Sequence, residues 1–335
     1  MMDVLKTFNE INVYGPSGRE DLTREAIRKI ASEFTKDIKT DAMGNLICHM
    51  EGKGGKKVMF SAHMDSIGLI ATVIEDGGYI RFGRVGGISP YNIVSQPVVF
   101  ANGTRGFVGV NEEVDWAKLT LEDMFIDIGA KDKAEAEKLV KAGDMAVYVA
   151  PTYTTLGGFI VGPYLDDRIC CVAQLMAMEQ LAAAGGPEND TYFVFTVQEE
   201  VGMRGAKPAG YAIDPDYFVV SDVTHTDDLP KSTHHCSSKP GKGGAIKVMD
   251  GSVIAHPQVV KMLEDLAKKN KIGYQMDVLK FGGTDAGVVH NGRAGVPSSG
   301  VSISIRNCHR PQEVASIYDV EETAKLLAAF ADYKF

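Results

Sequence analysis

The 335-residue sequence has no long hydrophobic run and no excess of positive charge. Lysine and arginine number 35 against 44 aspartates and glutamates, and the formal net charge is -9. Nucleic acid or an anionic membrane, as the main partner, would need clustered Lys and Arg, so the charge argues against both. The first residues mix acidic and apolar side chains, which is typical of neither a signal peptide nor a membrane span and predicts a cytoplasmic protein.

Cysteine is also scarce. The five cysteines lack the paired spacing of a structural zinc site or a disulfide framework. We therefore expect reduced thiols at Cys48, Cys170, Cys171, Cys236 and Cys308.

The apolar residues, 44% of the chain, suffice for a large domain and a smaller one. Outside residues 70–153, apolar strands alternate with helical patterns, which indicates an α/β fold. The predicted strands are 46–50, 58–62, 192–198, 217–221 and 301–305, and the predicted helices are one from about 20 to 34, 168–184, 256–269 and a final one near the end.

Between about residues 70 and 153 the pattern changes to short strands separated by glycine-containing turns, with one short helix near 134–140. This is typical of a compact β module that interrupts the α/β domain. The predicted divisions are 1–69 for the first part of the catalytic domain, 70–156 for the inserted β-rich domain and 157–335 for the second part.

Three predictions concern turns and helix ends. Ser17 and Glu20 match a capping box before the first amphipathic helix, and Asp319 and Glu322 are expected to cap the last one. Residues 51–56 are rich in glycine and lysine and are expected to form a flexible hairpin turn; no Gly-Lys-Ser/Thr follows, so a phosphate loop is disfavoured.

Acidic and imidazole side chains follow four of the apolar strands. Because ligands gather at the carboxyl ends of strands in an open α/β sheet, we expect these groups in one crevice. They are His63 and Asp65 after 58–62, Glu199 and Glu200 at the end of 192–198, Asp222 after 217–221, and His309 beyond 301–305.

Imidazoles and carboxylates suit zinc or cobalt, with manganese also possible, and a site that binds substrate keeps a coordination position for water. One His and one carboxylate per metal, plus a shared carboxylate and a shared hydroxide, would balance a centre of two divalent metals. The candidate terminal ligands are His63, Glu200, Asp222 and His309, and the candidate bridge is Asp166, which precedes a helix.

Glu199 and Glu200 leave the strand end in different directions, so Glu199 is expected to act as a general base rather than as a second ligand of the same metal. Asp65, two residues after His63, is expected to accept the N–H of that imidazole and fix its tautomer. Together these residues predict a metal-dependent hydrolase.

Each motif alone has a simpler interpretation. A Glu-Glu pair is usually a solvated surface, His63 and Asp65 could share a structural hydrogen bond, and Asp166-Asp167 could cap a helix. Five to seven such groups, all at strand ends or helix starts, favour the functional interpretation.

The other histidines are weaker candidates. His234-His235 fits a polar loop, and His49 and His256 are expected to be structural. His225 and His290 are expected near the substrate because they lie close to the predicted crevice.

Five motifs, in order and over nearly the whole chain, resemble the tetrahedral aminopeptidase (TET) family of dinuclear metallopeptidases, some of which carry the labels glutamyl aminopeptidase or endoglucanase. They are residues 197–206 around Glu199-Glu200, the Leu165-Asp166-Asp167-Arg168 turn, residues 222–225, the Gly282-Gly283-Thr284-Asp285-Ala286-Gly287 segment and residues 306–311 around His309.

The resemblance implies a mixed, mostly parallel sheet flanked by helices, of metallo-exopeptidase type, with an inserted small β-barrel-like dimerisation domain. It implies His63 and Asp222 on one metal, Glu200 and His309 on the other, Asp166 as the bridge and Glu199 as the base, and a cis peptide between Asp166 and Asp167. Asp285 is a further substrate-proximal candidate. Family members commonly assemble into hollow twelve-subunit tetrahedra, so a homo-oligomer is expected.

The sequence departs from the family pattern at Ser66, Asn307 and Arg310, near the substrate or behind the metal ligands. Arg310 would favour acidic substrate side chains if it reached the site. The predicted function is removal of N-terminal residues from short peptides. The alternatives are a dinuclear deacylase or carboxypeptidase, which would need a cationic clamp from Arg204, Arg293 or Arg306, and a non-catalytic peptide-binding assembly protein.

Overall fold

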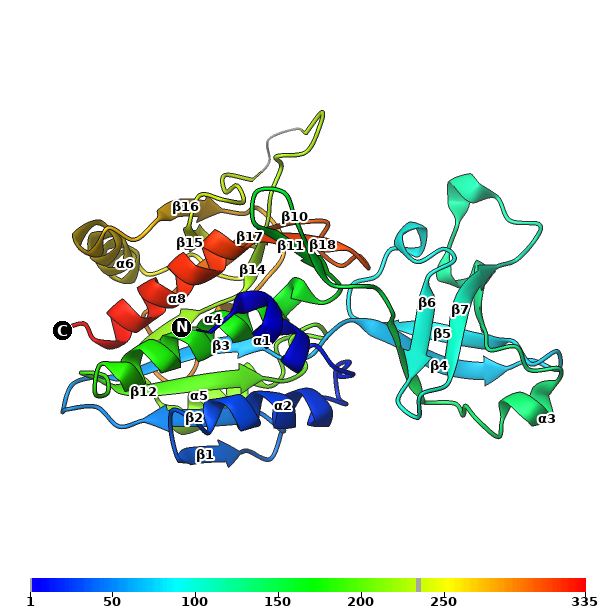
Figure 1. Cartoon of the computed structure of the whole chain (residues 1–335), viewed down its shortest axis with the longest axis horizontal. Coiled ribbons are helices and arrows are strands. Elements are labelled where there is room, and N and C mark those ends of the chain that lie inside the picture. Colours follow the sequence, from blue (N-terminus) through cyan, green and yellow to red (C-terminus); the bar gives the residue numbers. More distant parts are fainter. Residues whose placement is uncertain (1, 233–235) are drawn as a thin grey trace.

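The computed structural model describes residues 2–232 and 236–335, so the predicted loop at His234-His235 lies outside the described residues. The chain forms an α/β domain and a separate β-barrel that project side by side (Figure 1). The fold class predicted from the sequence is confirmed. No helix in the described part of the chain combines the length and apolar character needed to span a bilayer.

A twelve-stranded mixed sheet forms the centre of the α/β domain. Its main path runs β1 (Asp37–Thr40), β2 (Leu46–Met50), β12 (Asp190–Thr196), β3 (Lys57–His63), β13 (Tyr217–Val220), β17 (Ser298–Arg306), β18 (Glu313–Ser316), β11 (Phe159–Gly162) and β10 (Tyr153–Thr155). The strands β14 (Val223–His225), β15 (Gly244–Met249) and β16 (Tyr274–Val278) extend it from β17.

The four adjacent strands β12, β3, β13 and β17 are parallel to one another. These strands are mostly buried, which is typical of strands covered on both faces; their buried side chains are largely apolar in β12, β3 and β13, whereas β17 also buries Ser298, Ser299, Ser302 and Ser304. Their carboxyl ends therefore lie at one edge of the sheet, as predicted.

Helices cover the sheet on both sides (Figure 1). They are α1 (Val4–Ile11), α2 (Asp21–Ala31), α4 (Leu165–Ala183), α5 (Ala206–Ile213), α6 (Pro257–Asn270), α7 (Ala286–Val289) and α8 (Ile317–Ala331). The long helix α4 is buried along most of its length and packs against α8 and β3. Its first residues, Asp166 and Asp167, have non-helical backbone angles, and the peptide bond between them is cis.

The chain leaves the sheet after β3 and forms a closed antiparallel barrel before it returns with β10. The barrel order is β4 (Gly68–Ile74), β5 (Ile80–Val85), β8 (Met124–Asp127), β7 (Arg105–Val110), β6 (Pro97–Phe100) and β9 (Met145–Tyr148). Three 3-10 turns, η1 (Pro90–Asn92), η2 (Trp116–Lys118) and η3 (Leu121–Asp123), and the short helix α3 (Lys133–Ala136) join its strands.

Three local predictions were wrong. Residues 51–56 do not close a hairpin, because β12 lies between β2 and β3 and pairs with both. Ser17 and Glu20 form no capping box: the Ser17 hydroxyl donates to Asp65 instead, and no side chain caps α2. Asp319 and Glu322 lie inside α8, where their carboxylates accept backbone N–H groups of Gly243 and Gly273. At both predicted helix caps, a hydrogen-bond partner distant in the sequence replaces the expected local one.

Candidate metal centre

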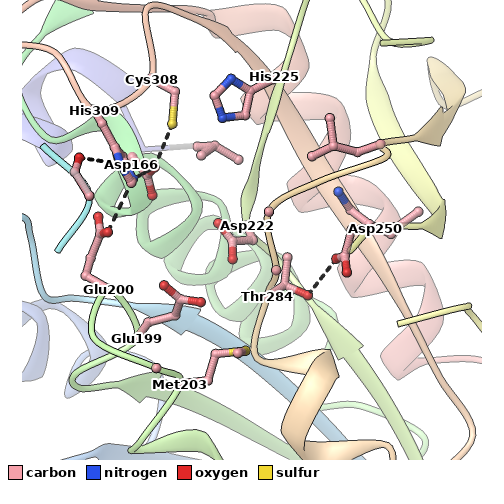
Figure 2. A pocket seen from close by; sticks show the side chains of 17 residues that line it. Asp166, Glu199, Glu200, Met203, Asp222, His225, Asp250, Thr284, Cys308 and His309 are labelled. Carbon is pink, nitrogen blue, oxygen red and sulfur yellow. Dashed lines mark hydrogen bonds and ion pairs between the residues drawn. The ribbon is translucent and has the colours of Figure 1, made fainter. Parts of the chain in front are cut away.

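The carboxyl ends of the parallel strands bring the predicted ligands together. His63 ends β3, Asp222 follows β13, and Glu199 and Glu200 lie three and four residues beyond the end of β12. Figure 2 shows Asp166, Glu199, Glu200, Asp222 and His309 around one pocket. His63 is buried beneath it, with 2% of its surface exposed.

Asp166 lies between the two histidines. Its Oδ1 atom is 3.1 Å from Nε2 of His63, and its Oδ2 atom is 3.2 Å from Nε2 of His309. The same His309 nitrogen is 3.2 Å from Oε2 of Glu200. Each oxygen of one carboxylate therefore faces a different imidazole, which is the arrangement that a carboxylate bridging two cations requires.

Asp65 contacts both His63 and the backbone of Glu199 and Glu200. Its carboxylate accepts the backbone N–H groups of Glu199, at 3.0 Å, and Glu200, at 3.3 Å, and the hydroxyl of Ser17, at 2.6 Å. Nδ1 of His63 lies 3.1 Å from the Asp65 backbone oxygen and 3.5 Å from its carboxylate. The nearer acceptor for an N–H at Nδ1 is therefore the carbonyl rather than the predicted carboxylate. With the proton on Nδ1, Nε2 remains free to bind a metal.

Three further side chains position the ligands and were missed in the sequence. The Glu313 carboxylate accepts the backbone N–H groups of Asp166, at 3.0 Å, and His309, at 2.7 Å. Asp167 accepts the backbone N–H of His63 at 3.0 Å. Cys308 donates its thiol to Asp166 at 3.1 Å (Figure 2). The position of Glu313, four residues after His309 and at the start of β18, is the only local signal that could have indicated its role.

A loop of the barrel domain also reaches the site. Nδ1 of His309 lies 2.8 Å from the backbone oxygen of Gly87. A Cβ atom at Gly87 would lie 2.8 Å from that same nitrogen, and one at Gly86 would lie 3.3 Å from Glu200. Gly86 and Gly87 form one of the glycine-containing turns predicted between residues 70 and 153, and their lack of a side chain permits close approach of the barrel to the ligands.

Burial and mutual repulsion govern the ionisation of the cluster. Burial raises the pKa of Glu199 well above its ordinary value, and the carboxylates of Asp222 and Asp285 add to the rise. Burial likewise raises the pKa of Asp222 and of Asp167. Burial alone would raise the pKa of Asp166, but the hydrogen bonds with His309 and His63 outweigh it and hold the pKa well below the ordinary range.

The residues present suit divalent cations. Donor atoms of His63, Asp166 and Glu200, of Asp166, Cys308 and His309, and of His63, Asp167 and Asp222 form overlapping groups whose atoms lie within 4.8 Å of one another. Oε1 of Glu200 and Oδ1 of Asp167 are buried without a hydrogen-bond partner among the described residues. Such a concentration of buried carboxylate is costly unless positive charge compensates it.

The remaining predicted residues are placed as follows. His225 lines the pocket and contacts Phe281 edge to face. Asp285 is buried and accepts a hydrogen bond from Thr196, and it does not line the pocket. Arg310 is exposed and His290 lies against α7, so neither reaches the pocket.

The four parallel strands of the mixed sheet thus carry a cluster of imidazoles and carboxylates at their ends, beside an inserted barrel. The family model of M42 glutamyl aminopeptidases matches residues 44–326. The chain belongs to this family.

Two relatives align with this chain over almost its full length. A putative aminopeptidase of Acetivibrio thermocellus is 45% identical over 98% of this chain and 97% of its own. A lysyl aminopeptidase of Pyrococcus furiosus is 36% identical over 95% of this chain and 93% of its own. The resemblance to the TET aminopeptidases is therefore confirmed, and the chain is a peptide hydrolase.

Two solved structures superpose on almost the whole chain. An aminopeptidase from the archaeon Desulfurococcus kamchatkensis superposes with a TM-score of 0.92 at 34% identity, covering 98% of this chain and 94% of that one. The TET1 peptidase of Pyrococcus horikoshii superposes with a TM-score of 0.89 at 33% identity, covering 98% and 99%, and can assemble into a tetrahedron or a large octahedral shell.

Proposed function

We propose that this chain is an aminopeptidase that removes N-terminal residues from short peptides with two divalent cations. His63 and Asp222 would hold one cation, and Glu200 and His309 the other. Asp166 would bridge them, since its two oxygens face the two imidazoles at 3.1 and 3.2 Å. This single observation carries the proposal, because a carboxylate that served one cation would not need both histidines.

When bound, the cations would lower the pKa of a water between them and polarise the scissile carbonyl. Glu199 lies at the pocket and has a raised pKa, so it suits the general base that takes a proton from the attacking water and returns it to the leaving nitrogen. Asp65 positions Glu199 and Glu200 through their backbone N–H groups.

The deacylase and carboxypeptidase alternatives need a cationic side chain in the pocket that is available to bind a substrate carboxylate. None of Arg204, Arg293 and Arg306 lines the pocket, and Arg306 is bound to Asp228 through two contacts of 2.9 and 2.6 Å. This observation favours the aminopeptidase over both alternatives.

The test combines metal analysis with substrate choice. Protein reconstituted separately with zinc, cobalt and manganese should bind about two equivalents per chain and lose peptidase activity on chelation. Peptides with a free amino terminus should be hydrolysed, and their Nα-acetylated counterparts should not. Retention of full activity after complete metal removal would refute the dinuclear site, and preference for acetylated peptides would refute the aminopeptidase assignment.

We further propose a homo-oligomer of the TET type, with the barrel as dimerisation domain, in the cytoplasm. The support is the assembly of the similar Pyrococcus horikoshii TET1 peptidase and the absence of disulfides among the five cysteines. A mass near twelve subunits in light scattering would agree with the proposal, whereas a monomer at micromolar concentration would contradict it.

A further inference from the structure

The cavity that contains the candidate metal site continues past it. Its volume is about 340 Å³, and Figure 2 shows Asp222 between the His309 and Glu200 side and a second side where Thr284 and Asp250 lie. We call this second side the distal pocket. It is lined by Met203, Lys247, Asp250, Leu279, Gly283 and Thr284.

Asp250 supplies a negative charge to the distal pocket. Its Oδ1 atom accepts three hydrogen bonds, two from Ser252, at 2.7 and 2.8 Å, and one from the backbone of Val253, at 3.0 Å. Its Oδ2 atom accepts only the Thr284 hydroxyl, at 3.2 Å, and so keeps capacity for a further donor. Across residues 2–232 and 236–335, no lysine, arginine or histidine forms an ion pair with this carboxylate, although it is only 5% exposed.

Lys247 is the one cationic side chain described in the distal pocket, and its charge is already compensated. Its Nζ atom lies 2.6 Å from Oδ2 of Asp277, and the two side chains are 1% and 0% exposed. It also donates to the Thr224 hydroxyl at 3.4 Å. The opposite charges of Lys247 and Asp277 compensate each other, so the pair adds no net positive charge to the distal pocket, and a substrate carboxylate would have to compete with Asp277 for Lys247.

We infer that the distal pocket receives the side chain of the substrate's N-terminal residue and selects basic side chains over acidic ones. This inference rests on the proposed function. The methylene groups of a lysine or arginine would pack against Met203 and Leu279, and the cation would meet Oδ2 of Asp250, which accepts only the Thr284 hydroxyl among the described residues. An acidic side chain would place a second negative charge beside Asp250, which opposes binding. The exposed Arg310 does not line the cavity and does not offset this charge.

The test uses the metal-loaded protein and the p-nitroanilides of lysine, norleucine and glutamate. Norleucine has the lysine methylenes without the ammonium group, so the ratio of kcat/KM values for lysine and norleucine measures the charge preference alone. We expect a ratio of about 10 to 100 in the wild type, with glutamate slowest. In Asp250→Asn the ratio should fall to near one, because the amide keeps the Oδ1 acceptor but removes the charge. Asp265→Asn, on the exposed face of α6, is the matched control and should keep the wild-type ratio.

A binding measurement keeps the inference testable if Asp250→Asn does not fold or no substrate is cleaved. L-lysine should raise the melting temperature of the metal-loaded wild type more than L-norleucine does. Hydrolysis of glutamate or norleucine substrates as fast as lysine, or equal stabilisation by the two amino acids, overturns the inference. Absence of hydrolysis with every free-amine substrate overturns the proposed function instead, and the binding result then decides the pocket separately.

Discussion

The α/β domain and the inserted barrel bury different kinds of side chain. The barrel interior is an apolar cluster that includes Leu69, Val108, Met124 and Ile126. Among the described residues at positions 67–165, Tyr148 and Tyr164 are the only buried side chains with a polar atom, and none is charged. The α/β domain instead buries a network of acids and histidines at the carboxyl ends of its parallel strands, in addition to its own apolar cores.

The difference shows where the molecule serves function rather than stability. An apolar interior is stable without partners, whereas buried carboxylates need hydrogen bonds and positive charge. The α/β domain provides the hydrogen bonds through backbone N–H groups, two of them donated to Asp65 and two to Glu313. Bound cations would supply the positive charge. The two regions should therefore respond to substitution in opposite ways.

The largest effect on activity is expected at Glu199. Glu199→Gln should lower kcat by about 10²- to 10⁴-fold because the amide cannot accept the water's proton. The metal content, measured by mass spectrometry, should stay at the wild-type value. The exposed Glu33→Gln is the control for a lost carboxylate and should remain fully active. Near wild-type turnover in Glu199→Gln would rule out this residue as the base.

In the barrel we expect a large effect on stability and none on metal binding. Ile126→Ala removes a fully buried side chain from β8 and should lower the free energy of unfolding of the barrel by about 2–5 kcal/mol in urea titrations. Val73→Ala, at a barrel position that is 56% exposed, should change it by less than about 0.5 kcal/mol. Loss of metal affinity in Ile126→Ala would show that the two regions are coupled more strongly than their interiors suggest.

At Asp65, in contrast to Ile126 in the barrel, we expect the main effect on metal binding rather than on stability. Asp65→Asn should weaken metal binding by about 10- to 100-fold, measured by competition with a chelating dye, because it disturbs both His63 and the backbone of Glu199 and Glu200. Ser17→Ala removes one of the hydrogen bonds to the same carboxylate and should give a smaller loss. Unchanged affinity in both variants would contradict the positioning role.

The smallest effect concerns pH. Burial raises the pKa of Glu20 from 4.5 to about 7. Between these values the unfolded chain has lost a proton that the folded chain retains, so stability should fall as the pH rises, by at most about 1.4 kcal/mol per pH unit. Glu20→Gln cannot titrate and should flatten this part of the curve of unfolding free energy against pH. An unchanged slope would show that other groups dominate it.

Much of the fold was predictable because apolar runs report burial directly. The strands at 58–62 and 217–221 were placed within one residue of β3 and β13, and their parallel alignment explains why His63 and Asp222 converge. The helix α1 was missed although Asp3 caps it by accepting the backbone N–H of Lys6, because its eight residues give only about two turns of helical periodicity. The caps at Ser17 and Asp319 failed because their side chains bind partners far away in the sequence.

The sequence by itself determined which residue types follow which strands, since periodic burial and strand-end polarity are local properties of the chain. Only the tertiary structure decided that each oxygen of Asp166 faces a different histidine and that Glu313 and the Gly86-Gly87 loop complete the site. It also decided that Lys247 pairs with Asp277, while Asp250 has hydrogen bonds but no ion-pair partner among the described residues. The physical reason is that hydrogen bonds and charge compensation act over a few ångströms in space and carry no fixed separation along the chain.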